Sequence, residues 1–247
     1  MIMTIKKVFN KKNFTDNAGS NKVSSFKTDL GVDNGWVVDT YWALSDAQEI
    51  NIFNANLTVP QPPKDKENQV IFLFTGLQDQ KGSFLNNHIL QPVLQWGKSL
   101  VGGGQYWSIA SWYVGLTTIS VSELLPVNPG DLITTKISGV YNDESKLYNY
   151  DCSIESKDTN RSVLHVYSIP KLQELVTALE VYGIDQCSQY PASAMTEFNN
   201  ILINGKLTPD NIPWDISKSI TECGQDIKII SDASNNGSIK VIYQKGR

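Results

Sequence analysis

NHILQPVLQWGKSLVGGGQYWSIASWYV, residues 87–114, is the stretch that decides the fold. Two apolar runs rich in β-branched and aromatic residues flank Gly102-Gly103-Gly104, a pattern that predicts an antiparallel hairpin. Alternation with period 2 divides the first run into Ile89, Gln91, Val93 and Gln95 on one face and Leu90, Leu94 and Trp96 on the other. In the second run, one face carries Trp107, Ile109, Ser111 and Tyr113. The other face carries Tyr106, Ser108, Ala110, Trp112 and Val114. Aromatic and amide side chains in this arrangement suit either an ordinary sandwich core or a groove for an extended ligand.

Strand-like runs continue on both sides of this hairpin, about ten residues apart and separated by turn residues. They cover residues 35–44, 49–59, 69–76, 119–125, 132–141, 148–156, 161–169, 197–204, 226–231 and 238–244. The unbroken apolar run at 69–76 is typical of a central strand buried on both faces. We therefore expect one all-β sandwich domain over residues 34–247, preceded by a polar arm at residues 1–33.

The segment 170–182, PKLQELVTALEVY, leaves two interpretations open. Leu172, Leu175, Val176 and Leu179 recur with the spacing of an amphipathic helix. Residues 176–184 also alternate as a strand, with Ala178, Glu180 and Tyr182 on one face. Periodicity alone does not decide between helix and strand here.

The composition is that of a soluble globular protein and excludes several classes of function. A net charge of -4 and a pI near 5.2 provide no basic surface for nucleic acid. No apolar run approaches the roughly 20 residues of a membrane helix. The lysine-rich start of the chain has no apolar core, so we expect no secretory signal and a cytoplasmic location unless a leader has been removed.

Cysteine and histidine are too sparse for several kinds of site. The three cysteines show no zinc-binding spacing, so we expect no metal and no cofactor. A Cys187–Cys223 bridge is possible in an oxidising compartment, but we expect three reduced thiols. With only two histidines, the sequence offers few candidates for the histidine of a nucleophilic triad. We expect His88 to be a surface residue rather than a catalytic one.

The order of several short motifs resembles the eqolisins, the glutamic peptidases with a concanavalin A-like (jelly-roll type) sandwich of two curved antiparallel sheets. The matching pieces span residues 36–204. They are Leu57 to Pro63, Phe72 to Leu77, Ile89-Leu90-Gln91, Tyr106 to Tyr113, Pro129-Gly130-Asp131, Ala178-Leu179-Glu180 through Asp185, and Glu197 to Asn200. The resemblance implies that residues 176–184 form a strand rather than a helix.

The resemblance implies that Glu180 and Gln91 form a catalytic pair in an acid-acting endopeptidase. Glu180 would take a proton from water, and the amide of Gln91 would stabilise the tetrahedral intermediate. The substrate, a peptide, would lie in the concave groove. Residues expected to contact it are Gln95, Trp107, Trp112, Tyr113 and Tyr182. The chain departs from the family pattern after the glutamine, where Pro92 and Val93 follow and Gln95 takes the place of an aspartate.

Two other functions remain open. A lectin-like module would bind a glycan in the same groove, with aromatic rings against sugar C–H faces and amides against hydroxyl groups. A glycosidase needs two carboxylates flanking one groove, and the sequence offers Glu180 with glutamine neighbours instead. No part of the sequence indicates an oligomeric state.

Overall fold

The computed structural model describes residues 35–79, 88–115, 118–157 and 161–244. These residues form two antiparallel sheets. Sheet A contains β1 (Gly35–Ala43), β3 (Val70–Gln78), β4 (Ile89–Ser99), β5 (Gly102–Val114), β6 (Ile119–Val121), β7 (Leu125–Val127), β11 (Glu174–Tyr182) and β13 (Asp215–Lys218). Sheet B contains β2 (Ile52–Thr58), β8 (Leu132–Asn142), β9 (Leu147–Ser156), β10 (Ser162–Ile169), β12 (Met195–Asn204), β14 (Asp226–Ser231) and β15 (Asn235–Ile242). A short 3-10 helix, η1 (Cys187–Gln189), follows β11.

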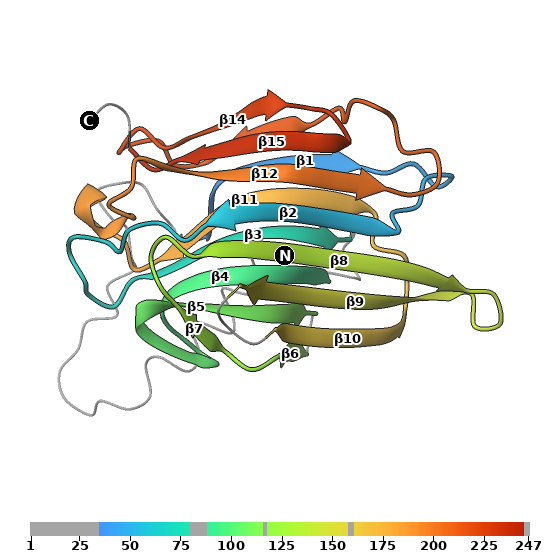
Figure 1. The fold of residues 1–247 in the computed structure, drawn as a ribbon, viewed down its shortest axis with the longest axis horizontal. Helices are drawn as coiled ribbons and strands as arrows, with labels where there is room; N and C mark the ends of the chain where they lie inside the picture. The colour runs from blue at the N-terminus through green and yellow to red at the C-terminus, as the bar shows by residue number, and fades with distance from the viewer. Residues whose placement is uncertain (1–34, 80–87, 116–117, 158–160, 245–247) are drawn as a thin grey trace.

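The two sheets stack with their strands running in similar directions, as in an aligned β-sandwich (Figure 1). Sheet A has the order β13-β1-β11-β3-β4-β5-β6, with β7 also pairing with β5. Sheet B has the order β10-β9-β8-β2-β12-β15-β14. The predicted all-β sandwich of two antiparallel sheets is confirmed.

The layer between the sheets is a single large apolar cluster. Sheet A contributes side chains such as Leu73, Leu94 and Trp107, and sheet B contributes Phe53 and Ile137. Every residue of β3 is buried, because one face of this strand meets sheet B and its other face joins a second apolar cluster. The expectation of a central strand buried on both faces is therefore confirmed.

The predicted hairpin is present as β4 and β5, paired from Ile89–Val114 to Ser99–Gly102. It bends at a register shift between Trp96 and Gly97. Gly97 has φ +88°, and a Cβ there would stand 2.1 Å from the carbonyl oxygen of Gln69, so only glycine fits. The bend brings the hairpin tip back toward Gln95, whose Nε2 donates to the carbonyls of Gly97 (2.9 Å) and Gly102 (3.0 Å).

Segment 174–182 is a strand, so the helical interpretation of its periodicity is wrong. β11 pairs with β1 on one side and with β3 on the other, and each of its residues is buried. Apolar residues on both faces of a buried strand produce spacings that also satisfy a helical pattern. The strand agrees with what the resemblance to the eqolisins implies for this segment.

Other differences from the expected elements are local. The run at 119–125 forms two short strands, β6 and β7, and the sequence pattern missed β13 within residues 215–218. Cys187 and Cys223 form a disulfide, while Cys152 is a buried free thiol, so the expectation of three reduced cysteines is wrong. The expected arm at residues 1–33 lies outside the described residues. Within the described part of the chain, no helix has the length and apolarity needed to cross a membrane.

Candidate functional site

The outer face of sheet A, directed away from sheet B, is the candidate site. Its strands carry a second apolar cluster, separate from the core between the sheets. Phe72, Val93, Trp112, Ala178 and Tyr182 belong to this cluster and share the face. Polar side chains lie among these apolar ones, and they distinguish the outer face from an ordinary core layer.

Glu180 lies on this face in a row that crosses the sheet. It pairs with Trp36 of β1 and with Phe72 of β3, and Phe72 in turn pairs with Gln95 of β4. A β-bulge separates Trp36 from Val38 directly opposite Glu180. Bulges of this kind re-aim side chains and occur frequently beside active sites.

Glu180 is a buried acid with one oxygen held in place. The hydroxyl of Tyr182, two residues further along β11, donates to Oε1 of Glu180. Burial raises the pKa of Glu180 to about 7, although the hydrogen bond from Tyr182 lowers it. Oε2 has no hydrogen-bond partner among the described residues. A carboxyl group in this state can exchange a proton near neutral pH and has one oxygen available for a ligand or water.

The two predicted glutamines both lie on the outer face, but only Gln95 shares the row of Glu180. Gln91 pairs with Trp112 and falls beside Gly76, four residues along β3 from Phe72. From strand spacing and rise, the Cα atoms of Glu180 and Gln91 are about 17 Å apart. The structure therefore places this predicted pair on one face without bringing its two members together.

A second buried glutamate on the outer face, Glu174, was not singled out from the sequence. It pairs with Gln78 of β3, whose Nε2 donates to Oε1 of Glu174 at 2.5 Å. Because Gln78 pairs with Ile89, Gln91 is a diagonal neighbour of Gln78. The Cα atoms of Glu174 and Gln91 are about 12 Å apart on the same geometric basis. Extending the alternation of Glu180 back along the strand would have found Glu174.

Asp39 is a third buried carboxylate on this face. It pairs with Ala178, two residues from Glu180, which makes Asp39 and Glu180 diagonal neighbours with Cα atoms about 7–8 Å apart. No sequence signal identified Asp39, because the bulge after Trp36 interrupts the alternation of β1.

The predicted aromatic contacts divide between the two faces of sheet A. Trp112 and Tyr182 lie on the outer face with Glu180. Trp107 and Tyr113 lie on the opposite face, contrary to prediction. Trp107 packs edge-on against Trp96 in the core between the sheets, and Tyr113 packs against the same core. The physical reason is the strict alternation of β5, which sends Trp107 and Tyr113 to the face opposite Trp112.

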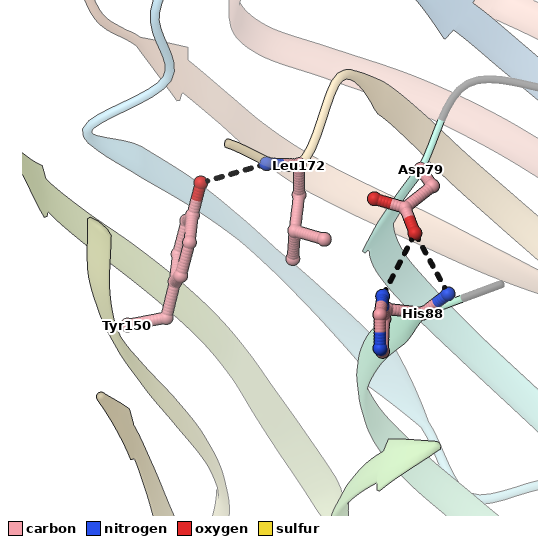
Figure 2. A network of polar contacts seen from close by, with 4 residues as sticks. All are labelled: Asp79, His88, Tyr150 and Leu172. Carbon is pink, nitrogen blue, oxygen red and sulfur yellow. Dashed lines mark hydrogen bonds and ion pairs between the residues drawn. The ribbon is translucent and has the colours of Figure 1, made fainter. Parts of the chain in front are cut away.

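His88 is half-buried at the start of β4 and makes a defined polar contact (Figure 2). Its Nδ1 lies 2.9 Å from Oδ2 of Asp79, and its backbone N–H donates to the same oxygen at 2.9 Å. The imidazole stacks on Tyr113, with ring centroids 5.6 Å apart. These contacts join the ends of β3 and β4 on the Tyr113 side of the sheet and leave His88 out of the outer-face set.

Several buried polar atoms of the outer face have no hydrogen-bond partner among the described residues. They are Trp36 Nε1, Gln91 Oε1, Gln95 Oε1, Trp112 Nε1 and Glu180 Oε2. Buried polar groups are normally paired, so atoms of this kind are suited to contact water or a ligand. No group of three or more His, Cys, Asp or Glu residues suited to a metal ion occurs in the described ranges.

Comparison with known proteins identifies the fold. No protein-family model matches the sequence, and no curated protein matches it. Scytalido-glutamic peptidase, solved with a peptide-based transition state analogue, superposes with a TM-score of 0.58 at 12% identity. SCP-B, an eqolisin-family peptidase in complex with the tripeptide Ala-Ile-His, superposes with a TM-score of 0.55 at 10% identity. Each match covers 85% of this chain and 98% of the other chain. The chain therefore has the sandwich fold of the eqolisin peptidases, which it resembles over most of its length.

Proposed function

We propose that this protein is a peptide-bond hydrolase of the glutamic peptidase type, with its active site on the outer face of sheet A. The observation that carries the proposal is Glu180: a buried carboxyl with a pKa of about 7, one oxygen held by Tyr182 and the other without a partner among the described residues. The peptide ligands of scytalido-glutamic peptidase and SCP-B agree with a peptide as substrate.

In the proposed reaction, Glu180 removes a proton from water as the oxygen attacks the peptide carbonyl. The protonated Glu180 then delivers that proton to the leaving amine, so no covalent intermediate forms. The carboxylate is the working form at the start of the cycle. Because its pKa is about 7, the fraction in this form falls as pH decreases below 7. The proposal therefore favours activity near neutral pH, unlike the acid-acting enzyme that the resemblance implies.

The oxyanion needs an amide donor, and each of the two outer-face glutamines meets only part of this requirement. Gln95 is the nearer glutamine in the Glu180 row, but its Nε2 already donates to two hairpin carbonyls. Gln91 has its Cα about 17 Å from that of Glu180, too far for both side chains to contact one peptide carbonyl, and it is closer to Glu174. Glu174 is thus the competing base: it satisfies the distance to Gln91 better, whereas Glu180 has the pKa and the available oxygen that the chemistry requires.

The test is cleavage of a denatured protein substrate by the wild type and by Glu180→Gln, Glu174→Gln, Gln91→Ala and Gln95→Ala. General acid–base groups of this kind contribute about 10²–10⁴-fold in rate. A loss of that size in Glu180→Gln, with Glu174→Gln active and all variants folded, supports the proposal, and the glutamine variant that loses activity with it identifies the amide donor. The reverse pattern for the two glutamates makes Glu174 the base. A wild type that cleaves nothing between about pH 4 and 9 contradicts the peptidase proposal.

Carbohydrate binding is a second candidate, favoured by the indole N–H groups of Trp36 and Trp112 and by the Gln91 and Gln95 oxygens that lack partners among the described residues. Aromatic rings bordered by such groups are suited to sugars.

The sequence-based argument against a glycosidase does not hold for the folded protein. Asp39 and Glu180 are diagonal neighbours on the outer face, which supplies the second carboxyl group that a glycosidase requires. A glycan-binding screen with wild type and Trp112→Ala tests this alternative.

A further inference from the structure

A cavity of about 390 Å³ lies at the β6 side of the outer face. It is formed by the tip of the β4–β5 hairpin and by the segment that runs from β6 toward β7. The residues that line it are Val101, Ile119, Val121, Ser122, Glu123 and Leu124. None of these residues belongs to the proposed catalytic set.

The cavity adjoins the apolar cluster of the candidate active site. Ile119, Val121 and Leu124 pack against the outer-face cluster that contains Phe72 and Trp112. Val121 pairs directly with Trp112 in the β5–β6 register. The edge-to-face contact of Trp112 with Phe72, centroids 5.7 Å apart, extends this surface to the row of Glu180. A peptide that follows this surface from Glu180 through Phe72 and Trp112 to Val121 arrives at the cavity.

The hairpin tip supplies the opposite wall. Val101, at the turn of the hairpin, is 38% exposed and lines the cavity although β6 pairs with the far end of β5. The bend at Gly97 and the hydrogen bond from Gln95 Nε2 to the Gly102 carbonyl hold the tip in this position. The cavity is thus bordered by two segments that are distant along β5.

The lining combines aliphatic walls with a single carboxylate. Val101, Ile119, Val121 and Leu124 are apolar, whereas Glu123 is exposed and its carboxylate takes part in no ion pair between described residues. The carbonyl of Glu123 accepts a hydrogen bond from Ser162 Oγ at 3.0 Å, which fixes the backbone at this position. Lysine and arginine place a long apolar stem along such walls and keep the charged end at the water-exposed rim.

We infer that this cavity is a specificity subsite for a lysine or arginine side chain of an extended peptide substrate, with Glu123 as its anionic partner. The inference rests on the proposed peptidase function. Four strand positions and four residues along the strands separate Glu180 from Val121, which is about 23 Å, or about seven residues of extended peptide. The basic residue is thus several positions from the bond that is cleaved, and short substrates do not reach the subsite.

The test uses a series of decapeptides that differ only in one residue, placed about seven positions from the cleavage site as Lys, Arg, norleucine or Glu. Wild type, Glu123→Gln and Glu123→Lys are compared by kcat/KM. The matched control is Glu144→Gln, which removes an exposed carboxylate from the β8–β9 turn. Exposed ion pairs give about two- to fivefold effects, so we expect wild type and Glu144→Gln to prefer Lys and Arg over norleucine by that factor. Glu123→Gln loses the preference, and Glu123→Lys shifts it to the Glu peptide.

The outcomes separate this inference from the proposed function. Cleavage of all four peptides with equal kcat/KM, or an unchanged preference in Glu123→Gln, overturns the subsite and leaves the peptidase proposal intact. If no peptide is cleaved, the proposed function fails. Calorimetric binding of the Lys and norleucine peptides to wild type and Glu123→Gln then decides the subsite: a Glu123-dependent preference supports it, and equal affinities overturn it.

Discussion

The hydroxyl of Tyr182 donates to the Glu180 carboxylate from two residues further along the same strand, and both side chains point to the outer face of sheet A. This relationship ties the protonation of the candidate base to one neighbouring side chain. The hydrogen bond stabilises the charged carboxylate and lowers its pKa, while burial raises the pKa to about 7.

Replacing Tyr182 with phenylalanine is expected to raise the pKa of Glu180 above about 7, because a hydrogen bond that favours the charged form is lost. The acidic limb of the pH–rate profile then moves to higher pH. The measurement is kcat/KM against pH for wild type and Tyr182→Phe. A Tyr41→Phe variant, on the same face in β1, is the control. An unshifted limb in Tyr182→Phe would show that Glu180 does not govern the rate.

Burial of Glu180 also predicts that stability decreases as pH rises. Its folded pKa, about 7, lies above the ordinary value of 4.5, so the folded state binds more protons between these values. The contribution of Glu180 to the free energy of unfolding is therefore fully present below pH 4.5. This contribution falls by about 3 kcal/mol as pH rises through 7. Urea unfolding from pH 4 to 8 measures the change. Glu180→Gln removes this component, and equal pH dependence in both proteins would contradict the burial.

The Cys187–Cys223 disulfide closes a loop with a sequence separation of 36 residues. Chain-entropy arguments assign such a crosslink about 4 kcal/mol of stability. A Cys187→Ser/Cys223→Ser double variant is expected to unfold at correspondingly lower denaturant concentration. Thiol titration of the denatured, unreduced protein checks the pairing and should find Cys152 alone. Reaction of all three cysteines would show that the bridge does not form and would favour a reducing compartment.

Two tryptophans of β5 test the separation of the faces. Trp107 is fully buried between the sheets, so Trp107→Ala is expected to cost about 3–5 kcal/mol of stability. Because Trp107 does not reach the outer face, the KM of the remaining folded enzyme stays near the wild-type value. Trp112→Ala is expected to weaken substrate binding, which raises KM. Circular dichroism melts and steady-state kinetics on both variants distinguish the two roles.

One glycine within β4 and one at a turn test the bend of the hairpin. Gly97→Ala is expected to destabilise strongly and displace the tip, because the new Cβ would meet the Gln69 carbonyl oxygen at 2.1 Å. Gly130→Ala is the matched control: φ is also positive, +94°, but no atom lies within 4 Å. The control is expected to lose only the stability that the new backbone strain costs, about 1–2 kcal/mol. Equal losses in denaturant unfolding would argue against close backbone contact at Gly97.

Local pattern by itself determined most of the secondary structure. The hairpin of β4 and β5 and the fully buried β3 follow from alternation and turn residues, which depend only on neighbouring positions. Alternation also placed Gln91 and Gln95 on one face. It did not distinguish helix from strand at 174–182, because a strand buried on both faces has no polar side to reveal its period.

Tertiary structure decided which side chains meet. Whether Gln91 lies near Glu174 or Glu180 depends on the registers of β11 with β3 and of β3 with β4, and these registers join segments far apart in the chain. The bulge that turns Asp39 toward the site and the bend at Gly97 are likewise fixed by neighbouring strands. The sequence determined which residues share a face because alternation is local, whereas their distances on that face required the paired strands.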